Sequence, residues 1–173
     1  MQKNFHNRLL ALSNVFDKIS IFVGYAMSFI VILLVMLIVF EVVLRYFFKS
    51  PTTWGTELQI FLYGTLCMLC ISYATYKKSH ARVDILLKKF SKKWQYILGI
   101  LYIFLFSLPF MVILLIFESK VAYHSWLIQE HSTWSPWQPL LYPIKSMIPL
   151  GAALFIFQCI SDLLKMIANN EDE

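Results

Sequence analysis

The sequence predicts an all-α membrane protein with four transmembrane helices, and three observations support this fold class. Of the 173 residues, 59% are hydrophobic and only 14% are charged, whereas soluble domains carry about 25% charged residues. Four apolar stretches are each long enough to cross the ~30 Å hydrocarbon core of a bilayer as a helix. Residues 28–40, SFIVILLVMLIVF, offer no polar face to water, which argues against a soluble helical bundle.

Residues 1–173 are expected to form a single membrane domain. We expect transmembrane helices at roughly residues 19–44, 58–76, 94–117 and 147–166. Residues 1–18 and 77–93 combine an apolar face with basic residues, so each is expected to form a helix in the membrane interface. The chain is expected to turn into the bilayer after residue 18. Residues 118–146 then form an outer loop, and residues 167–173 form a polar tail.

The distribution of basic residues predicts the orientation. Eleven of the fifteen Lys and Arg residues lie before the first span, between the second and third spans, or at the end of the fourth. The other four lie in the two opposite connections: Arg45, Lys49, Lys120 and Lys145. The positive-inside rule therefore predicts that both termini are cytoplasmic. A nucleic-acid partner is disfavoured, because the Lys cluster sits between two membrane helices.

Three charged residues lie where the first two spans meet the outer surface. Glu41 and Arg45 are four residues apart, so they share a helix face and are able to pair. Glu57 begins the second span at a similar depth. We hypothesise that Arg45 bridges the first two spans through Glu57 and fixes the outer end. In the alternative, Arg45 extends to the lipid headgroups and Glu57 is hydrated.

Two residues of the fourth span suggest helix packing. Gln158 lies in the middle of the span, where a lone amide is expected to hydrogen-bond to another helix. Gly151 precedes two alanines, and such small residues allow a neighbouring helix to approach closely.

The sequence lacks the residue patterns of catalysis and of cofactor binding. All four histidines fall outside the expected spans, which disfavours a membrane cytochrome because axial haem ligands would have to lie within helices. His124, Glu130 and His131 match no strong zinc pattern. There is no nucleophile constellation and no Gly-rich phosphate loop. We therefore expect no enzymatic activity, no metal and no cofactor. Only Gln158 is polar near the midplane, so a self-contained pump or channel is disfavoured.

Three sequence elements carry a family resemblance. The first is EVVLRYFFKSPTTWGTEL, the second is SHARVDILL, and the third runs from Trp137 into the fourth span. With these elements in this order, the chain resembles the small integral-membrane subunit of tripartite ATP-independent periplasmic (TRAP) transporters. The residues that we expect to serve structure and assembly are Glu41, Arg45, Trp54, Glu57, His80, Asp84, Gly151 and Gln158.

The resemblance implies a role as a scaffold rather than as the translocator. Such a subunit associates in the bacterial inner membrane, among membrane lipids, with a large elevator-type subunit that holds the substrate and sodium sites. A periplasmic binding protein delivers an organic acid, such as a C4-dicarboxylate or sialic acid. The loop around Trp134 and Trp137 is expected to face one of these partners.

Two alternatives from other functional classes remain open at this point. In the first alternative, the chain is an independent, homo-oligomeric exporter that uses Glu41 as its coupling acid. In the second, it is a structural subunit of a respiratory complex.

Overall fold

The computed structural model describes residues 2–77 and 92–170, with side chains described for residues 10–77, 94 and 97–166. Within this part of the chain, four helical segments are long and apolar enough to cross a membrane, as the sequence predicts. The helices are α1 (Gln2–Phe47), α2 (Gly55–Tyr76), α4 (Lys92–Tyr102), the π-helix η1 (Ile103–Ser107), α5 (Leu108–Leu127) and α6 (Tyr142–Asn170).

The first helix is longer than expected. Residues 1–18 were expected to form a separate interfacial helix, but α1 continues from Gln2 to Phe47. No proline interrupts this stretch, so nothing in the backbone chemistry forces a turn near residue 18. The helix ends where Lys49 takes a positive φ of 50° and Pro51 follows. Residues 78–91, including His80 and Asp84, lie outside the described residues.

The connection between the last two spans is shorter than expected. The third span was expected to end at residue 117 and the fourth to begin at residue 147. Instead α5 continues to Leu127 and α6 begins at Tyr142, which leaves residues 128–141 as the loop. The added turns of α5 bury Ala122 and Ser125, so helix packing favours their helical conformation.

A π-helical turn connects α4 to α5 just before Pro109. The Leu108 N–H donates to the Ile103 carbonyl, a bond five residues back instead of four. Proline has no N–H and its ring crowds the preceding helical turn. A π-turn, with one extra residue, is a common way to accommodate such a site within a continuous helix.

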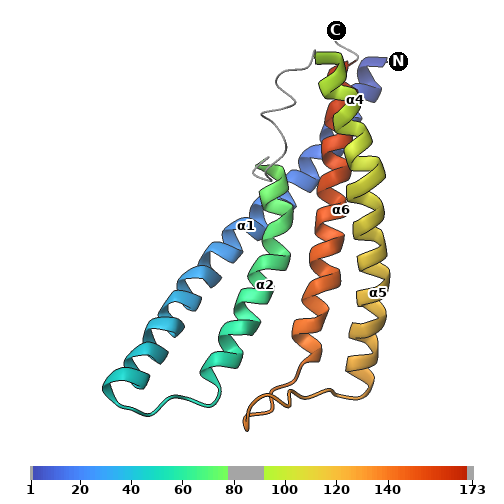
Figure 1. Ribbon diagram of the computed structural model, residues 1–173. Coiled ribbons are helices and arrows are strands. Elements are labelled where there is room, and N and C mark those ends of the chain that lie inside the picture. The colour runs from blue at the N-terminus through green and yellow to red at the C-terminus, as the bar shows by residue number, and fades with distance from the viewer. Residues whose placement is uncertain (1, 78–91, 171–173) are drawn as a thin grey trace.

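Helix α6 is the centre of the molecule. It packs against α1, α2 and α5, and the helices run side by side, with the two connections that the structure describes, residues 48–54 and 128–141, at one end (Figure 1). The beginning of α1 and the end of α6 lie at the opposite end (Figure 1). Of the 18 consecutive residues that form the most apolar part of α6, 39% are buried, whereas only 11% are buried in the corresponding part of α1. Burial therefore identifies α6 as the core helix, and α1 as the most exposed.

Glycines permit two close helix approaches. A Cβ on Gly151 would collide with the Met68 carbonyl oxygen of α2, so the small residue of the fourth span accommodates a helix of the same chain. A Cβ on Gly24 of α1 would collide with the Tyr73 ring of α2. The first contact is between the backbones of α6 and α2, and in the second a side chain of α2 packs directly on the backbone of α1.

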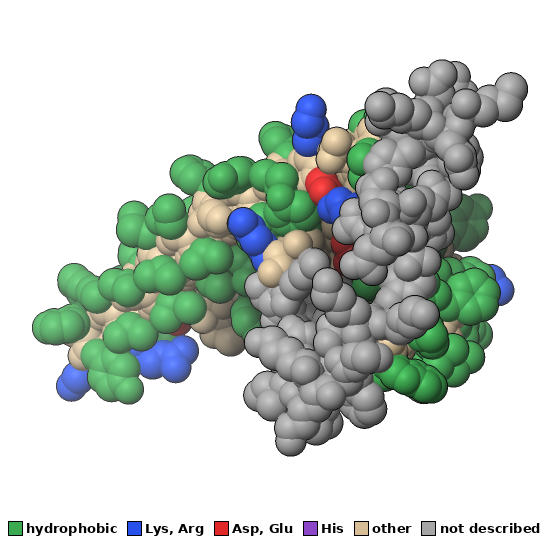
Figure 2. All heavy atoms as spheres, turned by 90° about the horizontal axis from the view of Figure 1, so that it is seen from above, with side chains coloured by type: hydrophobic (Ala, Val, Ile, Leu, Met, Phe, Trp, Pro, Cys, Tyr) green, Lys and Arg blue, Asp and Glu red, His purple; other side chains and the backbone are tan. Residues whose placement is uncertain are grey.

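Apolar side chains cover most of the outer surface. On α1, Phe22, Phe29 and Met36 are 73%, 74% and 68% exposed. In the view onto the end that carries the termini, hydrophobic side chains surround a few charged groups (Figure 2). Such a surface is stable in lipid or against an apolar partner, because exposed apolar area of this extent is unfavourable in water.

Candidate functional site

A buried polar network joins α1 to α6 near the end that carries the termini. Gln158, which has no exposed surface, accepts a hydrogen bond from Ser20 Oγ at 2.6 Å and donates to Asp17 Oδ1 at 3.1 Å. Ser161 donates to the same Asp17 oxygen at 2.8 Å. Lys165 donates to the other, Asp17 Oδ2. The carboxylate thus satisfies three donors from one helix.

The network continues at both of its edges. Ser161 Oγ lies 3.1 Å from Ser13 Oγ. The Lys165 ammonium lies 5.7 Å from the centroid of the Tyr76 ring, a cation–π distance that connects α2 to the network. We call Ser13, Asp17, Ser20, Gln158, Ser161 and Lys165 the α1–α6 network.

Sequence reasoning identified Gln158 but missed its partners. The missed signal was periodic: Ser13, Asp17 and Ser20 are spaced by four and three residues, as expected for one helix face. On α6, Ser161 and Lys165 follow Gln158 at the same kind of spacing. Two polar stripes within apolar helices predict that the stripes face each other, because unpaired polar groups are costly in hydrocarbon.

At the loop end, Glu41 closes the connection between α1 and α2. Its carboxylate accepts hydrogen bonds from Thr52 Oγ1 at 2.5 Å and from the Thr52 N–H at 3.3 Å. Thr52 Oγ1 in turn accepts the Gly55 N–H at 3.0 Å, which satisfies the first N–H group of α2. A Cβ on Gly55 would collide with Thr52 Oγ1 and crowd Glu41. Glu41, only 4% exposed, therefore organises this turn.

The position of Arg45 corrects the bridging hypothesis. Arg45 Nη2 lies 3.6 Å from Glu41 Oε1, within its own helix, and the side chain of Arg45 is 54% exposed. In the described part of the chain, Arg45 forms no ion pair with Glu57. Glu57 is only 6% exposed and accepts hydrogen bonds from other donors, so it does not compete with Glu41 for Arg45.

Glu57 anchors the loop between α5 and α6. Ser132 Oγ donates to Glu57 Oε1 and Ser135 Oγ donates to Glu57 Oε2. The same two hydroxyls each accept a backbone N–H, from Trp134 and from Trp137, at 3.3 Å. One buried carboxylate on α2 therefore fixes the conformation of a loop more than seventy residues away along the chain.

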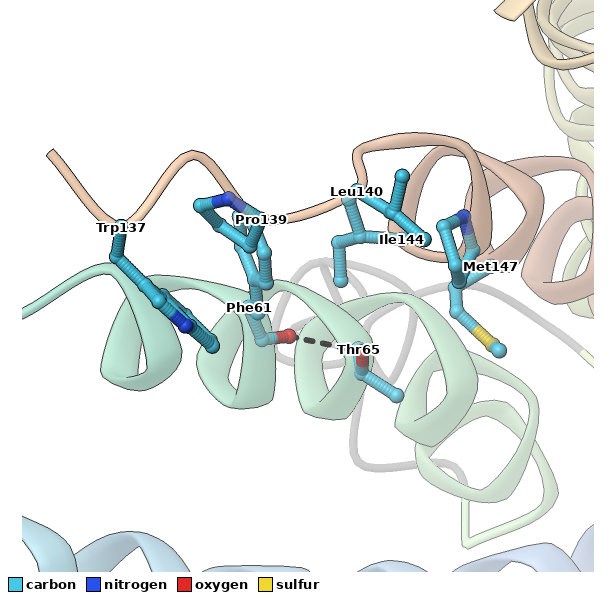
Figure 3. A pocket seen from close by; sticks show the side chains of 8 residues that line it. Phe61, Thr65, Trp137, Pro139, Leu140, Ile144 and Met147 are labelled. Atoms are coloured by element: carbon cyan, nitrogen blue, oxygen red, sulfur yellow. Dashed lines mark hydrogen bonds between the residues drawn. The ribbon is translucent and has the colours of Figure 1, made fainter. Parts of the chain in front are cut away.

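The two tryptophans of the loop have different surroundings. Trp134 is 88% exposed and Trp137 is 45% exposed. Trp137 lines a groove of about 280 Å³ between α2 and the start of α6, together with Phe61, Thr65, Pro139, Leu140, Pro143, Ile144 and Met147. Figure 3 shows the loop crossing over α2 with these side chains in the groove. Trp134 instead projects from a backbone that its neighbours hold in place.

Backbone and charge contacts complete the loop. Ser132 N–H donates to the Pro139 carbonyl at 2.8 Å, and Leu141 N–H donates to the Glu130 carbonyl at 2.8 Å. Lys145 of α6 forms an ion pair with Glu130. The hydrogen bond from Lys145 lowers the pKa of Glu130 from its usual value of 4.5. This region is thus ordered by its own contacts.

Trp54 lies beside α1. Its ring is stacked on Phe40, with the centroids 6.5 Å apart, so it packs the start of α2 against the end of α1. Among the described residues, no group of His, Cys, Asp and Glu is arranged to hold a metal ion. The buried carboxylates that the structure describes at the loop end bind hydroxyl and amide donors, which is a structural arrangement.

Comparison with protein families agrees with this architecture. Residues 34–169 match the family described as "Tripartite ATP-independent periplasmic transporters, DctQ component". The match covers the loop-end residues and three of the four spans in full. The chain belongs to the DctQ family.

DctQ proteins are the small membrane components of TRAP transporters, which confirms the resemblance found in the sequence. The family is a transporter component and not an enzyme family. It favours the TRAP assignment over an independent exporter or a respiratory subunit. No curated protein matches the chain.

Proposed function

We propose that this DctQ protein is a scaffold that holds the large, elevator-type subunit of a TRAP transporter in the bacterial inner membrane. The supporting observation is how its polar groups are used. Asp17, Gln158, Glu41 and Glu57 all bind donors of their own chain, while the outer faces of the helices are apolar. Such a molecule offers a large apolar surface for contact with a partner subunit and has few polar groups available to bind a transported solute.

The transporter in this proposal is a sodium-coupled importer of an organic acid. A periplasmic binding protein delivers the substrate, a C4-dicarboxylate, sialic acid or a similar anion. Both termini of the DctQ protein are cytoplasmic, in line with its eleven basic residues on that side. The loop of residues 128–141 then lies at the periplasmic surface, where the binding protein docks.

Purification of the C-terminally tagged protein from its native membranes tests the scaffold role. A mild detergent and mass spectrometry of the co-purifying proteins are required. We expect a far larger polytopic membrane protein in stoichiometric amount. A homo-oligomer without such a partner would contradict the proposal. Uptake by the purified complex in proteoliposomes, with and without a sodium gradient, then tests the coupling.

Trp134 is the residue that we propose for contact with a partner. It is a large side chain, almost fully exposed, on a backbone held by Ser132, and a rigid exposed tryptophan suits a protein interface. We expect Trp134→Ala to reduce uptake without lowering the melting temperature of the DctQ protein. Trp137→Ala, which removes part of the wall of the groove, is expected to lower the melting temperature. Unchanged uptake for both variants would contradict this role of the loop.

A further inference from the structure

A second cavity at the loop end is open to the surface, and three of its six lining residues are basic. It has a volume of about 460 Å³ and lies between the end of α5 and the start of α6. Its lining residues are Lys120, Val121, His124, Ile128, Glu130 and Lys145. Two ammonium groups and one imidazole thus share the cavity with a single carboxylate, so its charge is net positive.

Lys145 and Lys120 differ in their contacts. Lys145 is already paired with Glu130. Lys120 is exposed and forms no ion pair with any residue that the structure describes. Lys120 and His124 are one turn apart on the same face of α5. An anion in the cavity would therefore meet an uncompensated Lys120, with His124 beside it and Lys145 across from it.

The cavity lies at a depth that suits a lipid headgroup. Lys120 is about two turns, or ~10 Å at ~1.5 Å per residue, before the end of α5. The polar headgroup region extends ~5–8 Å beyond each side of the hydrocarbon core, and lysine side chains reach toward it. Ile113, Ile116 and Phe117 lie one and two turns deeper on α5 and are 50–63% exposed. They form an apolar stripe below the basic residues.

We propose that this cavity binds the phosphate of an anionic phospholipid, whose acyl chains lie along the exposed stripe of α5. The basic cavity supplies the headgroup contact and the stripe supplies the apolar contact. A free phosphate would use only the first of these. The proposal requires that the protein is embedded in a membrane, and it does not depend on the identity of the transported substrate.

Native mass spectrometry of the detergent-purified protein tests the site. The protein is exchanged with phosphatidylglycerol or with zwitterionic phosphatidylcholine of the same acyl chains. We expect selective retention of phosphatidylglycerol. Lys120→Gln is expected to weaken it by about fivefold, the effect of one basic residue near an anionic membrane surface. The matched control is Lys49→Gln, which removes an exposed charge from the same end of the molecule and is expected to leave retention unchanged.

Three outcomes would overturn the proposal. The first is equal retention of the two lipids by the wild-type protein. The second is an equal loss of retention in Lys120→Gln and Lys49→Gln, which would indicate attraction by overall charge. The third is binding of inorganic phosphate alone with the same dependence on Lys120, which would identify the site as one for the free anion. Melting temperatures of both variants, measured in parallel, exclude unfolding as the cause.

Discussion

Asp17 of α1 and Lys165 of α6 form an ion pair across the helix bundle, although 148 residues separate them in the sequence. The same carboxylate accepts hydrogen bonds from Gln158 and Ser161. This one residue therefore fixes the first helix against the core helix. Its position also explains why α6 is polar on one face near its end although it is a membrane-spanning helix.

Loss of the Asp17 carboxylate is expected to destabilise the protein. Asp17→Ala leaves the Lys165 ammonium without its counter-charge and removes the closest acceptor of Gln158 Nε2 and Ser161 Oγ. Among the described residues, Gln158 Nε2 then keeps only the Asp162 carboxylate, at 3.5 Å, and Ser161 keeps only Ser13. We expect a loss of about 1–3 kcal/mol, less than for a fully buried pair because the side chain of Lys165 is 34% exposed. The measurement is reversible unfolding in detergent.

A double-mutant cycle isolates the pair. Asp17→Ala combined with Lys165→Met is expected to cost less than the sum of the two single changes, because the double variant leaves no unpaired charge. Lys18→Met is the control for loss of a lysine charge, because it removes an exposed lysine from α1, the helix that carries Asp17. Strict additivity of Asp17→Ala and Lys165→Met would mean that the contact contributes nothing.

Gly151 and Gly64 offer a matched pair of tests for helix packing. Gly151→Ala places a methyl group against the Met68 carbonyl, and such overpacking costs about 1–3 kcal/mol. Gly64 has open space around its Cβ position. Gly64→Ala is therefore expected to be neutral, or to stabilise α2 by up to about 1 kcal/mol. Thermal unfolding of both variants measures the difference, and equal melting temperatures would contradict the close approach of α2 and α6.

Glu57 is expected to control the order of the loop. Glu57→Ala removes the acceptor of both Ser132 and Ser135, and an unsatisfied buried donor costs about 1–3 kcal/mol. We expect faster cleavage of residues 128–141 in limited proteolysis. Glu118→Ala on α5 removes a carboxylate that has no role in the loop, so its cleavage rate should match that of the wild type. Slow cleavage of Glu57→Ala would show that the loop is held by other contacts.

The Glu130–Lys145 pair predicts a dependence on acidic pH. The folded protein lowers the pKa of Glu130 below 4.5, so the folded state favours the ionised carboxylate. The stabilising contribution is complete above the usual pKa and is lost as the pH falls through the lowered value. The melting-temperature difference between wild type and Glu130→Gln should therefore be constant near neutral pH and shrink below pH 4.5. A difference that grows on acidification would have the wrong sign.

The sequence by itself determined the number of membrane-crossing helices and the family. Long apolar runs specify spans because each helix satisfies its own backbone hydrogen bonds in lipid, and this rule is local. The motif residues from Glu41 to Glu57 and from Trp137 to Gln158 can also be recognised from the sequence alone. Helix ends were less accurate, because residues 118–127 are polar enough for a loop but gain burial as part of α5.

Only the tertiary structure decided which polar groups meet. Spacing allowed Arg45 to pair with either Glu41 or Glu57, and the choice depended on a distant loop that brings Ser132 and Ser135 to Glu57. The pairing of Asp17 with Lys165 likewise required α1 and α6 to lie antiparallel and in contact. Such partners are set by three-dimensional packing, since a polar group in an apolar environment takes the nearest donor or acceptor that the fold supplies.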